Sequence, residues 1–184
     1  MKDTAYLHAF EQKLANILLE AIGENATYDG QLLASQDIED YWHSIAPEYM
    51  ADAVPQVAQY PTVSVAWACY LGMAVAHGWD TDWDITSKLP YSFYYGRCGF
   101  DDMDERITGE ILGFDVGGTD CSRLENHVRT LATAAVSAIR HEQIPPQSET
   151  AFHVFAATCS VLYKIGASME LKRLGYKLEK VNIK

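Results

Sequence analysis

The feature that most constrains the fold is a long stretch without charge. Residues 53–79 contain no Asp, Glu, Lys or Arg, a run of twenty-seven residues. Pro55 and Pro61 lie near its start, and proline is tolerated in the first turn of a helix but breaks its interior. A continuous helix is therefore predicted over residues 61–78, where Gly78 is placed to end it. A helix that is apolar on all sides is enclosed by other helices or lies in lipid.

Burial within a protein bundle is the better interpretation of this helix. Ser64 and His77 suit lipid poorly, and no Lys or Arg marks a cytoplasmic side as in a membrane span. Ala68, Gly72 and Ala76 recur at every fourth position, so a neighbouring helix backbone can come close. We therefore expect a buried central helix and no membrane contact.

Helical spacing also governs the rest of the chain. Apolar residues recur with that spacing in four further segments: residues 7–21, 38–45, 124–141 and 148–173. The predicted fold class is therefore all-α, a single-domain bundle of about six helices around the buried 61–78 helix. We expect the domain to span residues 1–175 and a basic C-terminal tail to follow at 176–184.

Local signals predict where some helices begin and end. The second helix is expected to begin near Ser35 or Asp37, and Pro47 is expected to end it because the ring removes a backbone donor. Ser122 and Glu125 form a capping-box pattern, which predicts a helix start there. The last long helix is expected to begin near Ser148.

The whole net charge of the protein lies in its first half. Between Lys13 and Lys88 there is no Lys or Arg but there are eleven acids, whereas the remaining acids and bases cancel to leave a formal charge of −11. Such a surface repels phosphate and anionic lipid and attracts cations or a basic partner. A nucleic-acid role could rest only on the basic tail, so we expect none.

An irregular, aromatic-rich segment is expected at residues 79–100. Tyrosine and tryptophan dominate binding hot spots because they bury a large area at little entropic cost. Trp83, Tyr94, Tyr95 and Arg97 are therefore predicted to contact a partner, which makes the chain a protein-binding or self-association module. Alternatively, these rings only seal one end of the bundle.

An enzymatic function is the alternative hypothesis. Asp80, Asp82 and Asp84 place three carboxylates at alternate positions, a spacing that can bind a divalent cation, although the later glycine and glutamate of an EF-hand are missing. His77 lies next to them and could act as a general base. Together they would form a cation-assisted hydrolase site. No other cofactor is expected.

Residues 114–119, Phe-Asp-Val-Gly-Gly-Thr, resemble the phosphate-binding turn of the sugar kinase and hexokinase superfamily. In that superfamily the motif lies near the N-terminus between two strands, whereas helical patterns flank it here. A glycine-rich connection between helices explains the residues more simply. Free amides at the start of the following helix could still hold an anion.

The cysteines and the N-terminus bear on location. Cys69, Cys98, Cys121 and Cys159 contain no CxxC pair, and no basic start followed by an apolar block marks a secretory signal. Free thiols in the cytoplasm are therefore the favoured interpretation. A Cys98–Cys121 bridge in an exported protein is the alternative.

Overall fold

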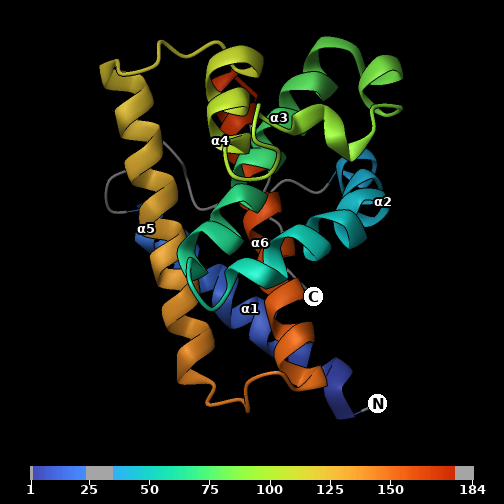
Figure 1. The fold of residues 1–184 in the computed structure, drawn as a ribbon, viewed down its shortest axis with the longest axis vertical. Helices are drawn as coiled ribbons and strands as arrows, with labels where there is room; N and C mark the ends of the chain where they lie inside the picture. The colour runs from blue at the N-terminus through green and yellow to red at the C-terminus, as the bar shows by residue number, and fades with distance from the viewer. Residues whose placement is uncertain (1, 24–34, 177–184) are drawn as a thin grey trace.

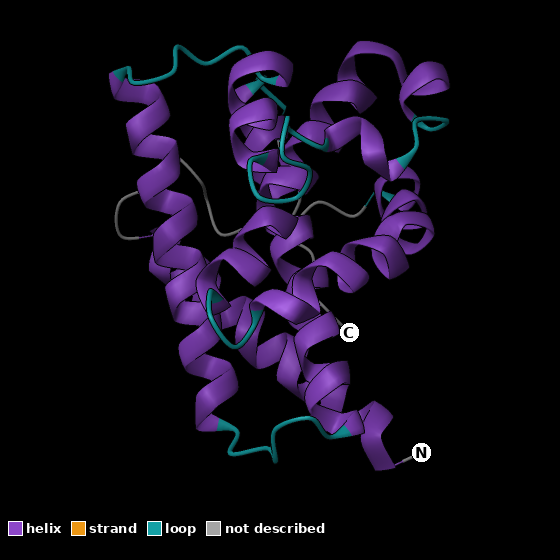
Figure 2. Cartoon of the chain, viewed as in Figure 1, coloured by secondary structure: helices purple, strands orange, loops and turns teal. Residues whose placement is uncertain are grey.

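The computed structural model describes residues 2–23 and 35–176, which form helices and no strand (Figures 1 and 2). The predicted all-α fold class is therefore confirmed. The six α-helices of the described residues are α1 (Lys2–Gly23), α2 (Gln36–Ala53), α3 (Pro61–Thr86), α4 (Met103–Glu105), α5 (Thr119–His141) and α6 (Glu149–Arg173). Two 3-10 turns, Val54–Gln56 and Tyr91–Tyr94, and a π-helical turn, Arg106–Ile111, lie between them.

Helix α3 is the axis of the bundle, as predicted. It packs most extensively against α6 and also against α5, while α1 covers α5 and α6 (Figure 1). Residues 64–66 and 68–76 of α3 are all buried. Helix α2 lies against α3 and α6 and carries Tyr41, Trp42 and Tyr49 into the core.

Helices α3 and α6 approach each other more closely than ordinary side chains permit. A methyl group built on Gly72 would overlap the backbone carbonyl of Tyr163, and one built on Gly166 would overlap that of Cys69. The small-residue stripe predicted on α3 thus allows close packing at Gly72. Helix α6 contributes a second glycine, Gly166, opposite Cys69.

Helix α3 continues to Thr86 instead of ending at Gly78. Gly78 allows the end of the helix to fold back closely, because a methyl group there would clash with the side chain of Thr86. The helical path is interrupted only at Asp82, whose φ of −164° and ψ of 97° are non-helical. The segment predicted to be irregular from residue 79 is therefore helical as far as Thr86, and its part without long helices begins only after that residue.

Two predicted helix boundaries are wrong. Pro47 lies inside α2, which continues to Ala53 because Ile45 and Tyr49 on either side of the proline are both buried. Helix α5 begins at Thr119 with Gly118 as its N-cap, so the capping-box pattern at Ser122 falls within the first turn.

Two predicted helix starts are confirmed. The hydroxyl of Ser35 accepts a hydrogen bond from the Ile38 amide (3.4 Å), and that of Ser148 accepts one from the Ala151 amide (3.1 Å). Both are N-caps of the expected kind.

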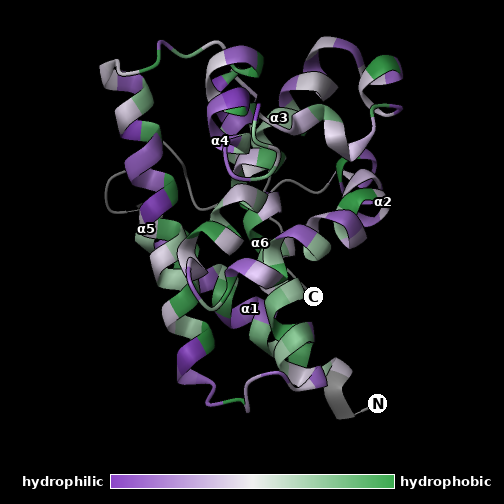
Figure 3. Ribbon diagram, in the orientation of Figure 1, coloured by the Kyte–Doolittle hydropathy of each residue, from purple (hydrophilic) through white to green (hydrophobic). Residues whose placement is uncertain are grey.

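One helix of the described part of the chain, α6, is long and apolar enough to cross a membrane. Its most apolar window has a mean hydropathy of 1.2, but 78% of that window is buried inside the fold. Figure 3 shows hydrophobic residues along the visible N-terminal part of α6. These properties fit a core helix.

All four cysteines are free, with Cys98 exposed and the other three buried.

Candidate functional site

The first part of the aromatic segment is built onto α2 through Tyr41. The ring of Trp83 lies 5.9 Å from that of Tyr41, centre to centre, and the Tyr94 ring lies 6.5 Å from it. The Tyr41 hydroxyl donates to the carbonyl of Leu89 (2.8 Å) and lies 3.3 Å from the Tyr94 hydroxyl. Tyr94 is only 1% exposed, so it could serve binding only by holding its neighbours, whereas Trp83 is half-buried and reachable.

The second part of the segment is anchored further along α2 by Asp52. Its carboxylate accepts hydrogen bonds from Tyr91 (2.9 Å) and Tyr95 (2.5 Å). Burial, together with this carboxylate, raises the pKa of Tyr95 to about 12. Tyr95 is half-buried, and Arg97 is exposed in the turn that follows.

Asp82 and Asp84 flank Trp83 in the sequence, and a further acid lies beside this end of α3 on α2. The indole N–H of Trp79 donates to the carboxylate of Asp37 at 3.4 Å, and this contact lies four residues before the Tyr41–Trp83 contact in both α2 and α3. Asp37 at the start of α2 therefore lies beside the end of α3, which carries three exposed aspartates. We call this the acidic aromatic surface; it consists of Asp37, Asp80, Asp82, Trp83 and Asp84.

Two of the three aspartates predicted to bind a metal make hydrogen bonds within the protein. The Tyr176 hydroxyl donates to the carboxylate of Asp80, and Asp82 accepts a hydrogen bond from the Ile85 amide (3.2 Å) as a cap for the turn after the helix break. All three aspartates are exposed. Within residues 2–23 and 35–176, no three His, Cys, Asp or Glu side chains group so as to hold a metal ion.

His77 meets a carboxylate from a different helix than expected. Its Nδ1 lies 3.0 Å from Oε1 of Glu170 in α6. Glu170 is fully buried and also accepts two hydrogen bonds from Arg173, at 2.8 and 2.6 Å. The Arg173 guanidinium in turn lies 4.8 Å from the centre of the Phe114 ring. A buried carboxylate between an imidazole and a guanidinium ties α3 to α6.

An apolar groove between α2 and α6 was not predicted. It has a volume of 680 Å³, and its lining residues are His43, Ala46, Pro47, Met50, Ala51, Val54, Pro55, Phe152 and Ala156. The sequence gives one indication of this groove: Val54, Pro55 and Val57 form an apolar stretch just after α2 that belongs to none of the predicted helices. The α6 side could not be paired with it from spacing alone. We call this feature the α2–α6 groove.

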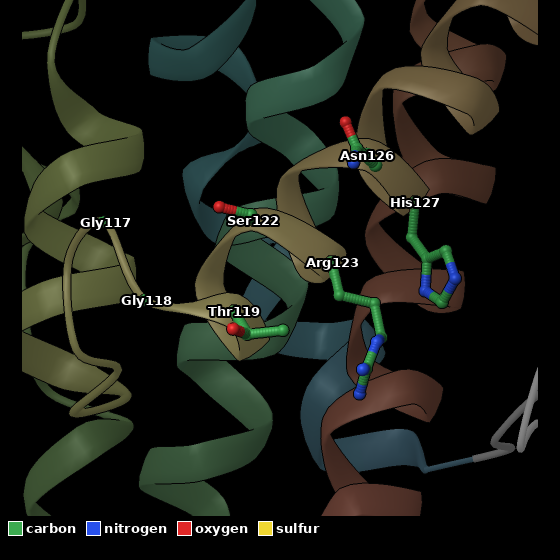
Figure 4. A pocket seen from close by; sticks show the side chains of 7 residues that line it. All are labelled: Gly117, Gly118, Thr119, Ser122, Arg123, Asn126 and His127. Atoms are coloured by element: carbon green, nitrogen blue, oxygen red, sulfur yellow. The ribbon is translucent and has the colours of Figure 1, made fainter.

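The glycine turn leads into an open, polar pocket of 470 Å³ at the start of α5 (Figure 4). Arg123 and His127 point the same way from the helix in Figure 4, whereas Asn126 points in the opposite direction. Arg123 lies 3.5 Å from Asp120 and its side chain is 66% exposed. The turn joins two helical segments, as in the simpler interpretation of the sequence, and lacks the flanking strands of the kinase motif within the described residues.

Comparison with known proteins adds no assignment: no protein-family model, curated protein or solved structure matches this chain.

Proposed function

We propose that this protein is a binding module that takes a basic protein partner on its acidic aromatic surface. One observation carries the proposal: the paired contacts Asp37–Trp79 and Tyr41–Trp83 join the start of α2 to the end of α3, where exposed aspartates flank the half-buried Trp83. No Lys or Arg occurs in residues 14–87, which include all of those acids.

This combination suits association with a cationic surface. Uncompensated carboxylates attract and orient a basic partner, which raises the association rate. A half-buried tryptophan on a helix supplies apolar contact area with little entropy to lose. Tyr95 lies further along the same segment and would extend the contact, whereas the cation of Arg97 would not favour a basic partner.

Self-association through this surface is the less favoured arrangement. Two copies facing each other here would bring carboxylates of the same sign together, which costs free energy. Salt therefore separates the two cases. It should weaken a complex with a basic partner and strengthen a dimer formed through the acids.

The test is capture of a partner from a lysate of the native cells by the wild-type chain and two matched variants. One variant removes charge from the surface (Asp80→Asn, Asp82→Asn and Asp84→Asn), and the control removes charge elsewhere (Asp101→Asn, Glu105→Gln and Asp120→Asn). We expect a basic protein that is retained by the control and lost in the first variant and at high salt. Equal retention by both variants would contradict the proposal.

The cation-assisted hydrolase has less support. His77 is engaged by Glu170, and Asp80 by Tyr176, so the expected base and carboxylate have different partners. We therefore do not propose that function.

A further inference from the structure

The α2–α6 groove presents apolar side chains to solvent in an unusual concentration. Phe152 from α6 is 47% exposed and Val54 from the end of α2 is 42% exposed. Pro47 and Met50 form the floor on the α2 side, and Ala156 continues the α6 side. Exposed apolar patches on a soluble domain mark contact sites.

The groove and the acidic aromatic surface lie on different sides of α2. Tyr41 and Asp52 hold the aromatic segment, whereas Pro47, Met50 and Val54 line the groove. At 100° per residue, the second set falls well away from the first around the helix. A partner in the groove would therefore make contacts separate from those proposed above.

Acids stand at both ends of the groove. On α2, Asp40 precedes the lining residue His43 by three positions, so it shares that helix face. On α6, Glu149 likewise precedes Phe152 by three positions, and its side chain is 87% exposed. Asp40 is also exposed.

Lys and Arg are missing from the same region, where the basic side chains present are His43 in the lining and His153, which lies 3.6 Å from Glu149. The groove is lined by no Lys or Arg, and none occurs in residues 141–163. The nearest cation along α6, Lys164, pairs with Glu39 of α2 at 2.7 Å. The start of α2 thus meets the later part of α6, whereas Met50 near the end of α2 lines the groove with Phe152 near the start of α6. The two helices therefore run in opposite directions, and the two acids lie at opposite ends.

We propose that the α2–α6 groove binds a basic amphipathic helix from another protein. A groove between two helices accepts the apolar stripe of a third, with anchors spaced three and four residues apart. Lys or Arg at the two ends of that helix would then meet Asp40 and Glu149. A second copy is a poorer occupant, because its own groove brings the same acids to the contact.

The proposal is tested by calorimetric titration with a synthetic helical peptide of leucine and lysine, patterned to be amphipathic. A peptide of the same pattern with glutamate for lysine is the charge control. Phe152→Ser changes the groove, and Trp83→Ala changes the acidic aromatic surface. Val116→Ser is the matched apolar control, because Val116 is 68% exposed and lies on another segment. Because Phe152 and Val116 are exposed, neither change should unfold the chain, which circular dichroism checks.

We expect the lysine peptide to bind, the glutamate peptide not to bind, and Phe152→Ser to weaken binding by about tenfold or more. Val116→Ser and Trp83→Ala should leave that affinity within about twofold. Loss of binding with Trp83→Ala alone would overturn the groove proposal while leaving the proposed function standing. A chain ending at Tyr176 that binds more tightly would assign the groove to the protein's own C-terminal residues, and a concentration-dependent dimer abolished by Phe152→Ser would assign it to a second copy. Either result would also overturn the proposal.

Discussion

Gly166 of α6 lies directly against the backbone of Cys69 in α3. A Cβ atom on Gly166 would stand 3.0 Å from the Cα of Cys69 and would overlap its carbonyl group. On the opposite helix Gly72 makes the reciprocal approach to Tyr163. Rigid backbone, not a movable side chain, therefore sets the distance between the two central helices, and the position of every surface built on them depends on it.

Alanine at Gly166 should destabilise the fold severely. The methyl group would force the central helices apart, and overpacking of this kind costs about 2–3 kcal/mol or more. Gly109→Ala is the matched control, because a Cβ there would meet only the exposed side chain of Val116, at 3.2 Å. Urea unfolding of both variants measures the difference. Equal stability of the two would show that the helices can separate at no cost.

Glu170→Gln should lower the free energy of unfolding by about 2–3 kcal/mol. The change removes the negative charge that His77 and Arg173 share in a buried site. Glu149→Gln, on an exposed position of the same helix, should change it by less than about 0.5 kcal/mol. Thermal melts of both variants provide the comparison, and a Glu170 variant as stable as its control would mean that the buried cluster does not hold α3 to α6.

Glu142 joins α1 to the end of α5. Its carboxylate accepts hydrogen bonds from Tyr6 (2.5 Å) and Lys13 (2.9 Å), which hold the pKa of Glu142 below its usual range. Glu142→Gln should cost about 1 kcal/mol at pH 7. A carboxyl whose pKa is lower in the folded state stabilises the fold at any pH above its pKa in the unfolded chain. That contribution is lost as the pH falls through its pKa in the folded state. The free energies of unfolding of variant and wild type should therefore converge as the pH falls below 4.5, the usual pKa of a glutamate. A difference that does not shrink as the pH is lowered would contradict this.

Asp104, in α4 just before the π-helical turn, should have the opposite pH dependence. Burial raises the pKa of Asp104 from 3.8 to about 6, and the nearby Glu105 and Glu125 add to the shift. The folded state therefore holds this proton more tightly than the unfolded chain, and ionisation between pH 4 and 6 costs stability. Asp104→Asn should stabilise the protein at pH 7 by about 1 kcal/mol, allowing for solvent screening, and have no effect below about pH 4.

Melting temperatures across that pH range measure the Asp104 effect. Asp101→Asn, at an exposed position just before α4, is the control and should leave the slope of stability against pH unchanged. A wild type and an Asp104 variant with parallel profiles would show that this carboxyl titrates normally.

The helical core could be predicted from local patterns. A charge-free run of this length leaves burial as the only fold in water, and Ser35 and Ser148 cap helices where their hydroxyls can reach a backbone amide three residues on. The prediction that Pro47 ends the second helix was wrong, because proline removes one hydrogen bond from a helix and burial of one face of α2 outweighs that loss. Gly78 misled because glycine also serves close packing.

The surfaces could be predicted only in part. The acids and aromatic rings were visible in the sequence, but the burial of Tyr94 depends on Tyr41, more than fifty residues away. The same holds for His77 and Glu170, which are separated by 93 residues. The groove needs both α2 and α6, and no spacing within either helix indicates that Phe152 faces Val54.

Amide hydrogen exchange of the chain, alone and with its captured partner, tests the central claim most directly. Binding at the start of α2 and at the end of α3 should slow exchange in residues 36–41 and 79–95, and salt that releases the partner should remove the protection. Protection confined to α5, residues 119–141, with these segments unchanged, would contradict the account.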